Sequence, residues 1–178
     1  MIKKIFYTLL ILIIGSFFYL SHFGINTSKF NQNSEKKIKE NYPMVDLKLN
    51  DVKILLNLIS LSIDLETEES IILSGKEKIK LEKVSSTFDL KSFIIGEFAV
   101  KNLAINTKKN NIKKFIKLAR SYKDGAQLLI IDKVIKSGNI KISIKLNFNE
   151  NGKLIDDKYE ITAQMNNLSI ELFNKQKI

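Results

Sequence analysis

The sequence contains no cysteine and no tryptophan, and among its 178 residues proline, histidine and arginine each occur once. A chain without cysteine has no disulfide, no thiolate nucleophile and no thiolate metal site. The one histidine, His22, has no second histidine or cysteine with which to share a metal ion, and no serine beyond it has a histidine to act as its base. The residue inventory therefore predicts that the protein is not an enzyme, has no metal site and needs no cofactor.

The charge of the chain is unbalanced. Lysine and arginine together number 29 against 19 acidic residues, which gives a net charge of +10, and every basic residue except Arg120 is a lysine. Proteins that read nucleic acid rely on the forked guanidinium group of arginine for phosphate and base edges, so we expect no nucleic-acid partner. Lysines that fill a solvated surface explain the excess, and attraction of these lysines to anionic lipid headgroups is a second interpretation.

The N-terminal segment is the longest apolar stretch. Residues 5–28 carry no charge, and Ile5–Leu20 is almost wholly apolar, which is close to the length of a bilayer-spanning helix. Lys3 and Lys4 precede it and favour a cytoplasmic N-terminus. We therefore predict a retained membrane anchor over residues 1–28. A cleaved signal peptide is the competing interpretation, and both place the rest of the chain outside the cytoplasm.

The anchor is followed by a polar segment and then by a β-rich one. Residues 29–43 are rich in lysine, and their few apolar residues recur at loose helical spacing until Pro43, the only proline. This pattern predicts a short juxtamembrane helix, with a solvated linker as the alternative. From Met44 onward the apolar residues recur every second position, so we expect residues 44–178 to form a β-domain.

One segment of this domain breaks the β rhythm. Ile112 and Ile116 lie on the apolar side of a helix predicted over Asn110–Tyr122, with lysines opposite. Beyond it, Leu128–Ile135, which is apolar except for Asp132 and Lys133, predicts another strand, and the small residues at 137–138 predict a turn.

The clearest alternation comes near the end of the chain. Every second residue from Ile140 to Phe148 is apolar, and the pattern returns after a turn at residues 149–152, where Asn-Gly supplies positive φ. With a third short run over residues 168–172, it predicts a β-meander with one apolar side. The residues expected to line that side, and to bind lipid if it is open, are Ile140, Ile142, Ile144, Leu146, Phe148, Tyr159, Ile161, Ala163 and Met165.

These patterns together predict a mainly β fold. An N-terminal transmembrane helix is followed by a curved, groove-like antiparallel β-sheet with one or two short amphipathic helices. The strands are many and the helices that could cover them are few, so a curled sheet would leave its apolar side free to receive acyl chains. A closed β-sandwich, in which the same side is ordinary core, is the alternative that the sequence leaves open.

The order of these elements resembles the N-terminal region of the AsmA-like family of envelope proteins (AsmA/TamB/YhdP type). The likeness spans nearly the whole chain and is carried by Asn41–Leu49, Lys78–Val84, Phe88–Ser92, Val100–Ile105 and Asn110–Tyr122. Members of that family are β-grooves, held in the inner membrane, that carry phospholipid across the periplasm and have no catalytic residues.

The resemblance implies a single-pass inner-membrane protein whose bulk is periplasmic. Such a protein would bind phospholipid acyl chains for intermembrane lipid transport or envelope maintenance, with the membrane, phospholipid and other envelope proteins as its partners. The residues themselves are also compatible with a second function. It is an anchored structural or adaptor domain, a closed sandwich that binds protein partners through an exposed edge strand.

Overall fold

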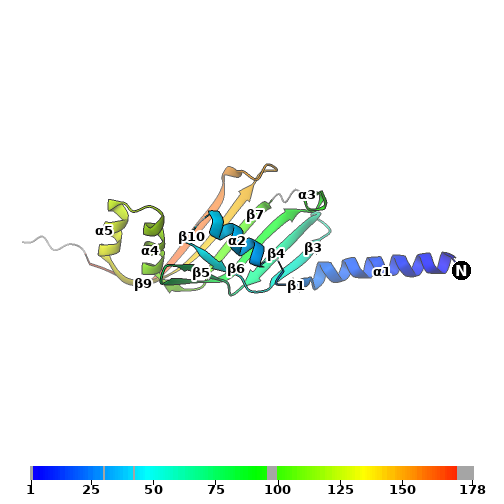
Figure 1. Cartoon of the computed structure of the whole chain (residues 1–178), viewed down its shortest axis with the longest axis horizontal. Coiled ribbons are helices and arrows are strands. Elements are labelled where there is room, and N and C mark those ends of the chain that lie inside the picture. The colour runs from blue at the N-terminus through cyan, green and yellow to red at the C-terminus, as the bar shows by residue number, and fades with distance from the viewer. Residues whose placement is uncertain (1, 30, 42, 96–99, 172–178) are drawn as a thin grey trace, which may run out of the picture.

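The computed structural model describes residues 2–29, 31–41, 43–95 and 100–171. Within these residues one long helix leads into an open antiparallel sheet of ten strands with short helices (Figure 1), which confirms the predicted mainly β fold. The helices are α1 (Ile2–His22), α2 (Asn31–Asn41), α3 (Leu90–Ile94), α4 (Ile112–Tyr122) and α5 (Ala126–Val134). The strands are β1 (Ile25–Thr27), β2 (Asp46–Lys48), β3 (Val52–Asn57), β4 (Ser62–Glu68), β5 (Ile71–Ser74), β6 (Glu77–Asp89), β7 (Val100–Thr107), β8 (Asn110–Asn111), β9 (Ile135–Phe148) and β10 (Leu154–Ile170).

Helix α1 projects from one end of the molecule along its long axis (Figure 1). Its 21 residues extend over about 31 Å at 1.5 Å per residue, close to the thickness of a bilayer's hydrocarbon core. The helix is long and apolar enough to cross a membrane, and a signal sequence has the same properties. Helix α2 occupies the segment for which a short helix was predicted, and it contacts β2. Its Glu35 carboxylate accepts from the N–H of Leu49, the residue after β2, at 2.9 Å.

The junction between α1 and the sheet is a single tight turn. The N–H groups of Phe23 and Gly24 both donate to the Tyr19 carbonyl, at 2.8 and 3.3 Å, and β1 begins at the next residue, Ile25. Gly24 has a φ of +67°, a left-handed value that costs an L side chain about 1–2 kcal/mol. Because β1 pairs with β3, the helix is joined to the sheet without a linker.

The main sheet runs in the order β1-β3-β4-β6-β7-β9-β10, with every pairing antiparallel. A second, smaller layer consists of β2, β5 and the first residues of β6, where Ile72 pairs with Ile79. Strand β6 therefore belongs to both layers. A register shift between Leu81 and Lys83 and a positive φ of 56° at Glu69 mark the point where the sheet bends.

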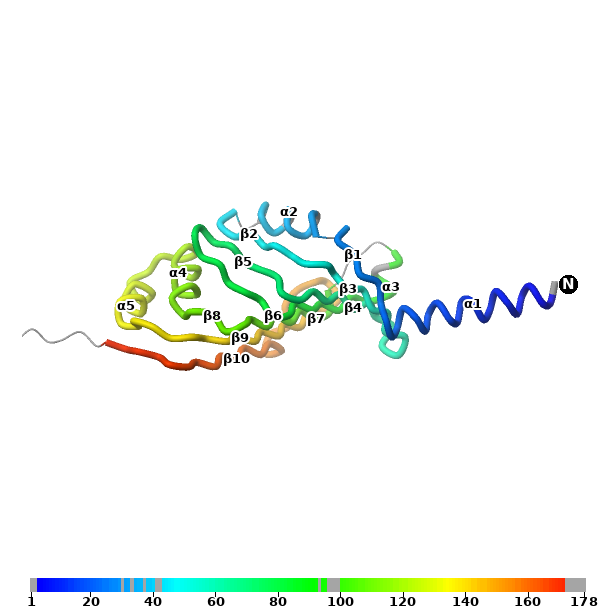
Figure 2. Tube along the Cα trace, turned by 90° about the horizontal axis from the view of Figure 1, so that it is seen from below, coloured from blue at the N-terminus to red at the C-terminus, as the bar shows by residue number. Residues whose placement is uncertain are grey.

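The smaller layer folds over one face of the main sheet. Figure 2 shows β2 and β5 on one side and β9 and β10 on the other, with α4 between them at the end far from α1. At this end Lys117 of α4 forms an ion pair with Glu77 of β6 at 2.6 Å, and the Lys114 ammonium donates to the Lys78 carbonyl. Ile79 and Leu81, which are 1% exposed, lie at the bend and form the most deeply buried apolar pair.

Helix α4 confirms the helix predicted from the sequence. The side chain of Asn111 caps its start by accepting from the Lys113 N–H at 2.9 Å. Its buried residues Ile112 and Ile116 pack against Ile140 of β9. The one strongly amphipathic helix after α1 therefore covers one end of the apolar face of the sheet.

Three local predictions were wrong. The run predicted as a strand at Leu128–Ile135 forms helix α5 and only the first residue of β9. The turn predicted at residues 137–138 lies inside β9, where Gly138 has a φ of +151° and Cβ at this position would lie 3.2 Å from the Leu168 Cα. The third run is not a separate strand: as far as residue 170 it continues β10, past a kink at Asn167 with φ of 53°.

The physical reason for helix α5 is its packing on α4. Leu129 donates its N–H to the Gly125 carbonyl at the first turn, and Asp132 bridges the two helices. Its carboxylate accepts from the Lys113 ammonium at 3.0 Å and the Arg120 guanidinium at 2.8 Å. A short apolar run has no periodicity of its own that separates strand from helix, so these contacts decide its structure.

The Asp132 bridge gives a prediction on pH. Lys113 first, and Arg120 after it, hold the pKa of Asp132 below its usual value. A carboxyl with a lowered folded-state pKa stabilises the fold above its unfolded pKa of about 3.9, and this contribution is lost as the pH falls toward the folded-state value. We expect Asp132→Asn to lower the free energy of unfolding at neutral pH by on the order of 1 kcal/mol and to flatten its acid dependence below about pH 4.

Chemical denaturation at a series of pH values measures both effects. Asp124→Asn is the matched control, since Asp124 contacts the same arginine at 3.3 Å but has a side chain that is 74% exposed. Solvent screens such a pair, so this variant should keep the wild-type pH profile. Equal pH profiles of stability for the Asp132 variant and the wild type would contradict a stabilising role for the Asp132 bridge.

Candidate functional site

The strand register places the apolar residues of six strands on one face of the main sheet, which we call the apolar face. Partners across an antiparallel pair share a face, and every second residue along a strand returns to it. Paired rows such as Leu56–Ile63–Phe88 and Ile54–Leu65–Ser86–Leu103–Leu146–Tyr159 cross the sheet. The row Val52–Thr67–Val84–Ile105–Ile144–Ile161 runs from β3 to β10.

The opposite face is polar. It carries the intervening residues, and ion pairs join neighbouring strands across it: Lys145 with Glu160 at 2.9 Å and Lys83 with Glu66 at 2.8 Å. The Lys101 ammonium on the neighbouring strand, together with the Ser92 N–H, holds the pKa of Asp89 below its usual value. The two faces of one sheet therefore differ sharply, with charge on one and hydrocarbon on the other.

One end of the apolar face is covered. Ile140 is 6% exposed beneath α4, and Ile142 packs partly against the same cluster. The Ile142 N–H donates to the Thr107 hydroxyl at 2.8 Å, which binds β9 to β7 near this point. Ile140 therefore belongs to the interior core rather than to an accessible surface, although the sequence placed it among the lining residues.

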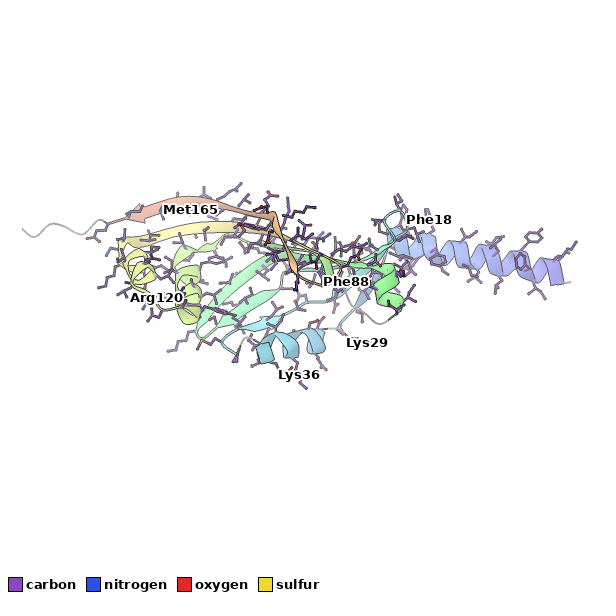
Figure 3. The ribbon with its side chains drawn as sticks, turned by 90° about the horizontal axis from the view of Figure 1, so that it is seen from above. Phe18, Lys29, Lys36, Phe88, Arg120 and Met165 are labelled. Carbon is purple, nitrogen blue, oxygen red and sulfur yellow. The ribbon has the colours of Figure 1, made fainter. Side chains whose placement is uncertain are left out.

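The outer edge of the face is open along β10. Tyr159 is 56% exposed, Ile161 60% and Met165 52%, and Ala163 between them is also exposed. Ile144, Leu146 and Phe148 on the adjacent β9 are half-buried. Figure 3 shows Met165 on β10, the outermost strand of the sheet, on the side of the molecule away from α2.

The nine residues singled out from the sequence thus lie on one face of one hairpin, β9–β10. Sequence reasoning missed the rest of the face, which β3, β4, β6 and β7 supply. The signal was present, because Ile54, Leu65 and Leu103 belong to the same alternating pattern, but pairing partners cannot be read from one sequence. The structure adds that the four predicted residues on β10 form the least covered part of a much wider apolar surface, whereas Ile140 on β9 is buried.

A cavity of about 850 Å³ lies where the β9–β10 hairpin turn meets α3. Phe148 and Ile155 give it apolar walls, and Lys91, Lys101 and Lys158 give it charge. One of the nine predicted residues, Phe148, therefore borders a space that has both hydrocarbon and ammonium groups. Among the described residues no group of three or more histidine or acidic side chains is arranged to hold a metal ion.

The fold and site define a mainly β protein with a long apolar N-terminal helix and an open antiparallel sheet, apolar on one face and polar on the other. None of the protein-family models, curated proteins or solved structures compared with this chain matches it. The functional argument therefore rests on the chain's own geometry.

Proposed function

We propose that this chain is an inner-membrane-anchored protein of AsmA-like type that binds phospholipid acyl chains on its apolar face. In this proposal α1 crosses the membrane once with the N-terminus in the cytoplasm, and the sheet lies in the periplasm. The role is lipid transport between membranes or maintenance of the envelope. The observation that carries the proposal is the row of exposed apolar side chains on β10, which continues a face shared by six strands.

The energetics favour a hydrocarbon ligand on such a face. Soluble monomeric proteins rarely leave broad contiguous apolar patches in water, and each buried methylene group of a ligand contributes about 0.8 kcal/mol. Half-buried residues such as Ile144 and Leu146 keep some surface free next to the exposed Ile161. An acyl chain lying against them would need no polar partner, while lysines at the rim, such as Lys158, stay in water.

A second candidate is an adaptor domain, which the outer edge of β10 favours. This strand has 17 residues, ends the strand order of the described sheet and pairs only with β9 there. Unpaired N–H and C=O groups along an edge strand can receive a strand from a protein partner. In that case the apolar face of β10 would be covered by protein, and no lipid would be retained.

The test is the lipid content of the purified full-length protein. It is extracted with mild detergent, washed, and its bound lipid is quantified by mass spectrometry. The test variant combines Ile144→Asp with Ile161→Asp, a directly paired couple on the apolar face. The matched control combines Ser143→Asp with Thr162→Asp, the adjacent couple on the same strands and on the polar face. Both place two carboxylates opposite each other, so both variants carry cross-strand repulsion and differ in the face that receives the charge.

We expect phospholipid with the wild type and the control, and at least about tenfold less with the test variant, because a carboxylate disfavours contact with hydrocarbon. Thermal unfolding of all three proteins shows whether the sheet is intact. Equal lipid in test and control would contradict binding on this face. No lipid in any of them, together with a stable complex through β10, would support the adaptor instead.

A further inference from the structure

The turn between β3 and β4 has an unusual composition. Three of its residues are large and apolar, and all project into solvent: Leu58 is 44% exposed, Ile59 98% and Leu61 59%. Surface turns are ordinarily built from glycine, proline, asparagine, aspartate and serine. Exposed apolar residues that cluster at one tip mark a surface that meets something apolar.

Hydrogen bonds to one side chain hold the turn together. The side-chain oxygen of Asn57 accepts from the N–H groups of Ile59 and Ser60, each at 3.1 Å. Leu61 has a φ of +48°, a conformation that L residues adopt at a cost of about 1–2 kcal/mol. The backbone thus holds these side chains outward, in a fixed direction, rather than folding them onto the sheet.

The tip lies beside the last turns of α1. A cavity of about 660 Å³ separates them, with Ile14, Phe17 and Phe18 of α1 on one wall and Leu58 and Ile59 on the other. Ile14 lies eight residues before the end of the helix at His22, which is about 12 Å along its axis. The tip therefore reaches back along α1, past the point where the helix joins the sheet.

A second apolar group lies at the same end. Ile94 at the end of α3 is 74% exposed and Ile95, which follows it, is 60% exposed, next to the exposed Lys91. Helix α3 contacts β4 and β6, and Figures 1 and 2 show α3 and the β3–β4 turn at the end from which α1 leaves the sheet. Figure 3 shows Phe18 of α1 at this end and Arg120 of α4 at the opposite one.

We infer that the β3–β4 tip (Leu58–Leu61) and Ile94–Ile95 insert into the surface of the lipid bilayer that α1 crosses. A bilayer is the expected partner of the tip because the tip lies next to α1. The tight junction at Gly24 and the β1–β3 pairing fix the tip next to helix residues such as Phe17, which a bilayer would cover. Apolar side chains near a lysine suit the boundary between headgroups and acyl chains.

This inference depends on the membrane crossing by α1 in the proposed function, and not on lipid bound to the apolar face. It also goes beyond an anchor. Besides α1, two further points on the domain would contact the membrane, and three points fix an orientation. The sheet would then stand on the bilayer in a fixed orientation, with α5 far from the membrane and the β5–β6 turn also at the end away from α1 (Figure 2).

The absence of cysteine makes the test direct, because any introduced cysteine is the only one in the chain. Full-length Ile59→Cys is labelled with an environment-sensitive fluorophore and reconstituted in vesicles of phosphatidylethanolamine and phosphatidylglycerol. The vesicles carry either no quencher or a lipid with a nitroxide near the headgroup end of its acyl chain. Tyr7→Cys within α1 reports the anchor, and Lys76→Cys in the β5–β6 turn is the control for solvent.

We expect the Ile59 probe to shift to shorter emission wavelength and to lose about half or more of its fluorescence to the nitroxide lipid, as a group 5–10 Å inside the boundary would. The Lys76 probe should keep its signal. A quenched Tyr7 probe with an unquenched Ile59 probe would overturn the docking while leaving the anchor intact. An unquenched Tyr7 probe would overturn the membrane crossing and the docking together. Native circular dichroism of the labelled proteins excludes misfolding, since Ile59 has almost no contacts to lose.

Discussion

Replacing Asn110 with alanine is expected to cost about 3 kcal/mol of stability, one of the two largest effects predicted for a single substitution in this chain. The Asn110 side chain is 5% exposed and satisfies three backbone groups. Its oxygen accepts from the Lys80 N–H at 2.8 Å, and its nitrogen donates to the carbonyls of Lys80 and Lys108, at 2.9 and 2.7 Å. Each lost bond contributes about 1 kcal/mol, and an unsatisfied backbone group near the core adds to the cost.

The position of Asn110 explains why these bonds are important. The pairing of β6 with β7 ends at Leu81 and Thr107, where β6 turns into the folded-over layer. The amide of Asn110 bonds to the side of Lys80 on which the ladder with β7 has ended, while the other side of Lys80 pairs with Ile71 of β5. Without it, the folded-over layer should loosen from the main sheet.

Asn111→Ala is the matched control for this prediction. Asn111 is the next residue, and its side chain makes only the helix-capping bond to the Lys113 N–H at 2.9 Å, so its loss should cost about 1 kcal/mol. Asn110→Asp should resemble Asn110→Ala, because a carboxylate keeps the acceptor but loses both donors. Urea unfolding in detergent measures all three, and a cost for Asn110→Ala no larger than that for Asn111→Ala would contradict the argument.

The second large effect is expected for Gly24→Ala, at about 3 kcal/mol or more. A Cβ atom at Gly24 would lie 2.5 Å from the Ile54 carbonyl oxygen, which is part of the β3 backbone and cannot rotate away. The positive φ adds the ordinary left-handed penalty. Relief requires β1 to move away from β3, so we expect both lower stability and faster amide exchange at Ile25–Thr27.

Gly75→Ala separates these two causes. Gly75 has a similar φ of +57°, but no atom lies within 4 Å of the added Cβ. Its substitution should cost only the backbone penalty of about 1–2 kcal/mol and leave β1 exchange unchanged. If the two glycine variants were equally stable, the close contact between Gly24 and Ile54 would have no energetic role.

The parts of the fold that sequence predicted correctly are those with a strong local period. Alternation at Ile140–Phe148 and Tyr159–Met165 identified the β9–β10 hairpin, and the 3.6-residue spacing of Ile112 and Ile116 identified α4. These patterns follow from the geometry of a single element.

The parts that failed depend on contacts between distant residues. The run Leu128–Ile135 is mostly apolar and has no helical period of its own, and the contacts of Asp132 with Lys113 and Arg120 hold most of it as a helix against α4. Gly138 suggests a turn in the sequence, but it lies inside strand β9. Glycine is needed there because a Cβ atom would lie too close to Leu168. The burial of Ile140 depends on α4, whose position over β9 no local pattern encodes.

For the candidate site, the sequence identified an apolar row but not its extent or coverage. Ile140 and Ile161 follow the same alternating pattern in the sequence, but the Ile140 side chain is 6% exposed and that of Ile161 is 60% exposed. That difference arises because β10 is the outermost strand, whereas α4 covers β9 around Ile140.

Strand β6 is shared by the main sheet and the folded-over layer, and this has a mechanical consequence. The two layers are joined by one continuous strand and held apart at one end by α4, which packs on Ile140 of β9 and bonds to Glu77 and Lys78 of β6. A change in that spacing would have to bend β6 and break its contacts with α4, so the two layers are expected to move together as one body.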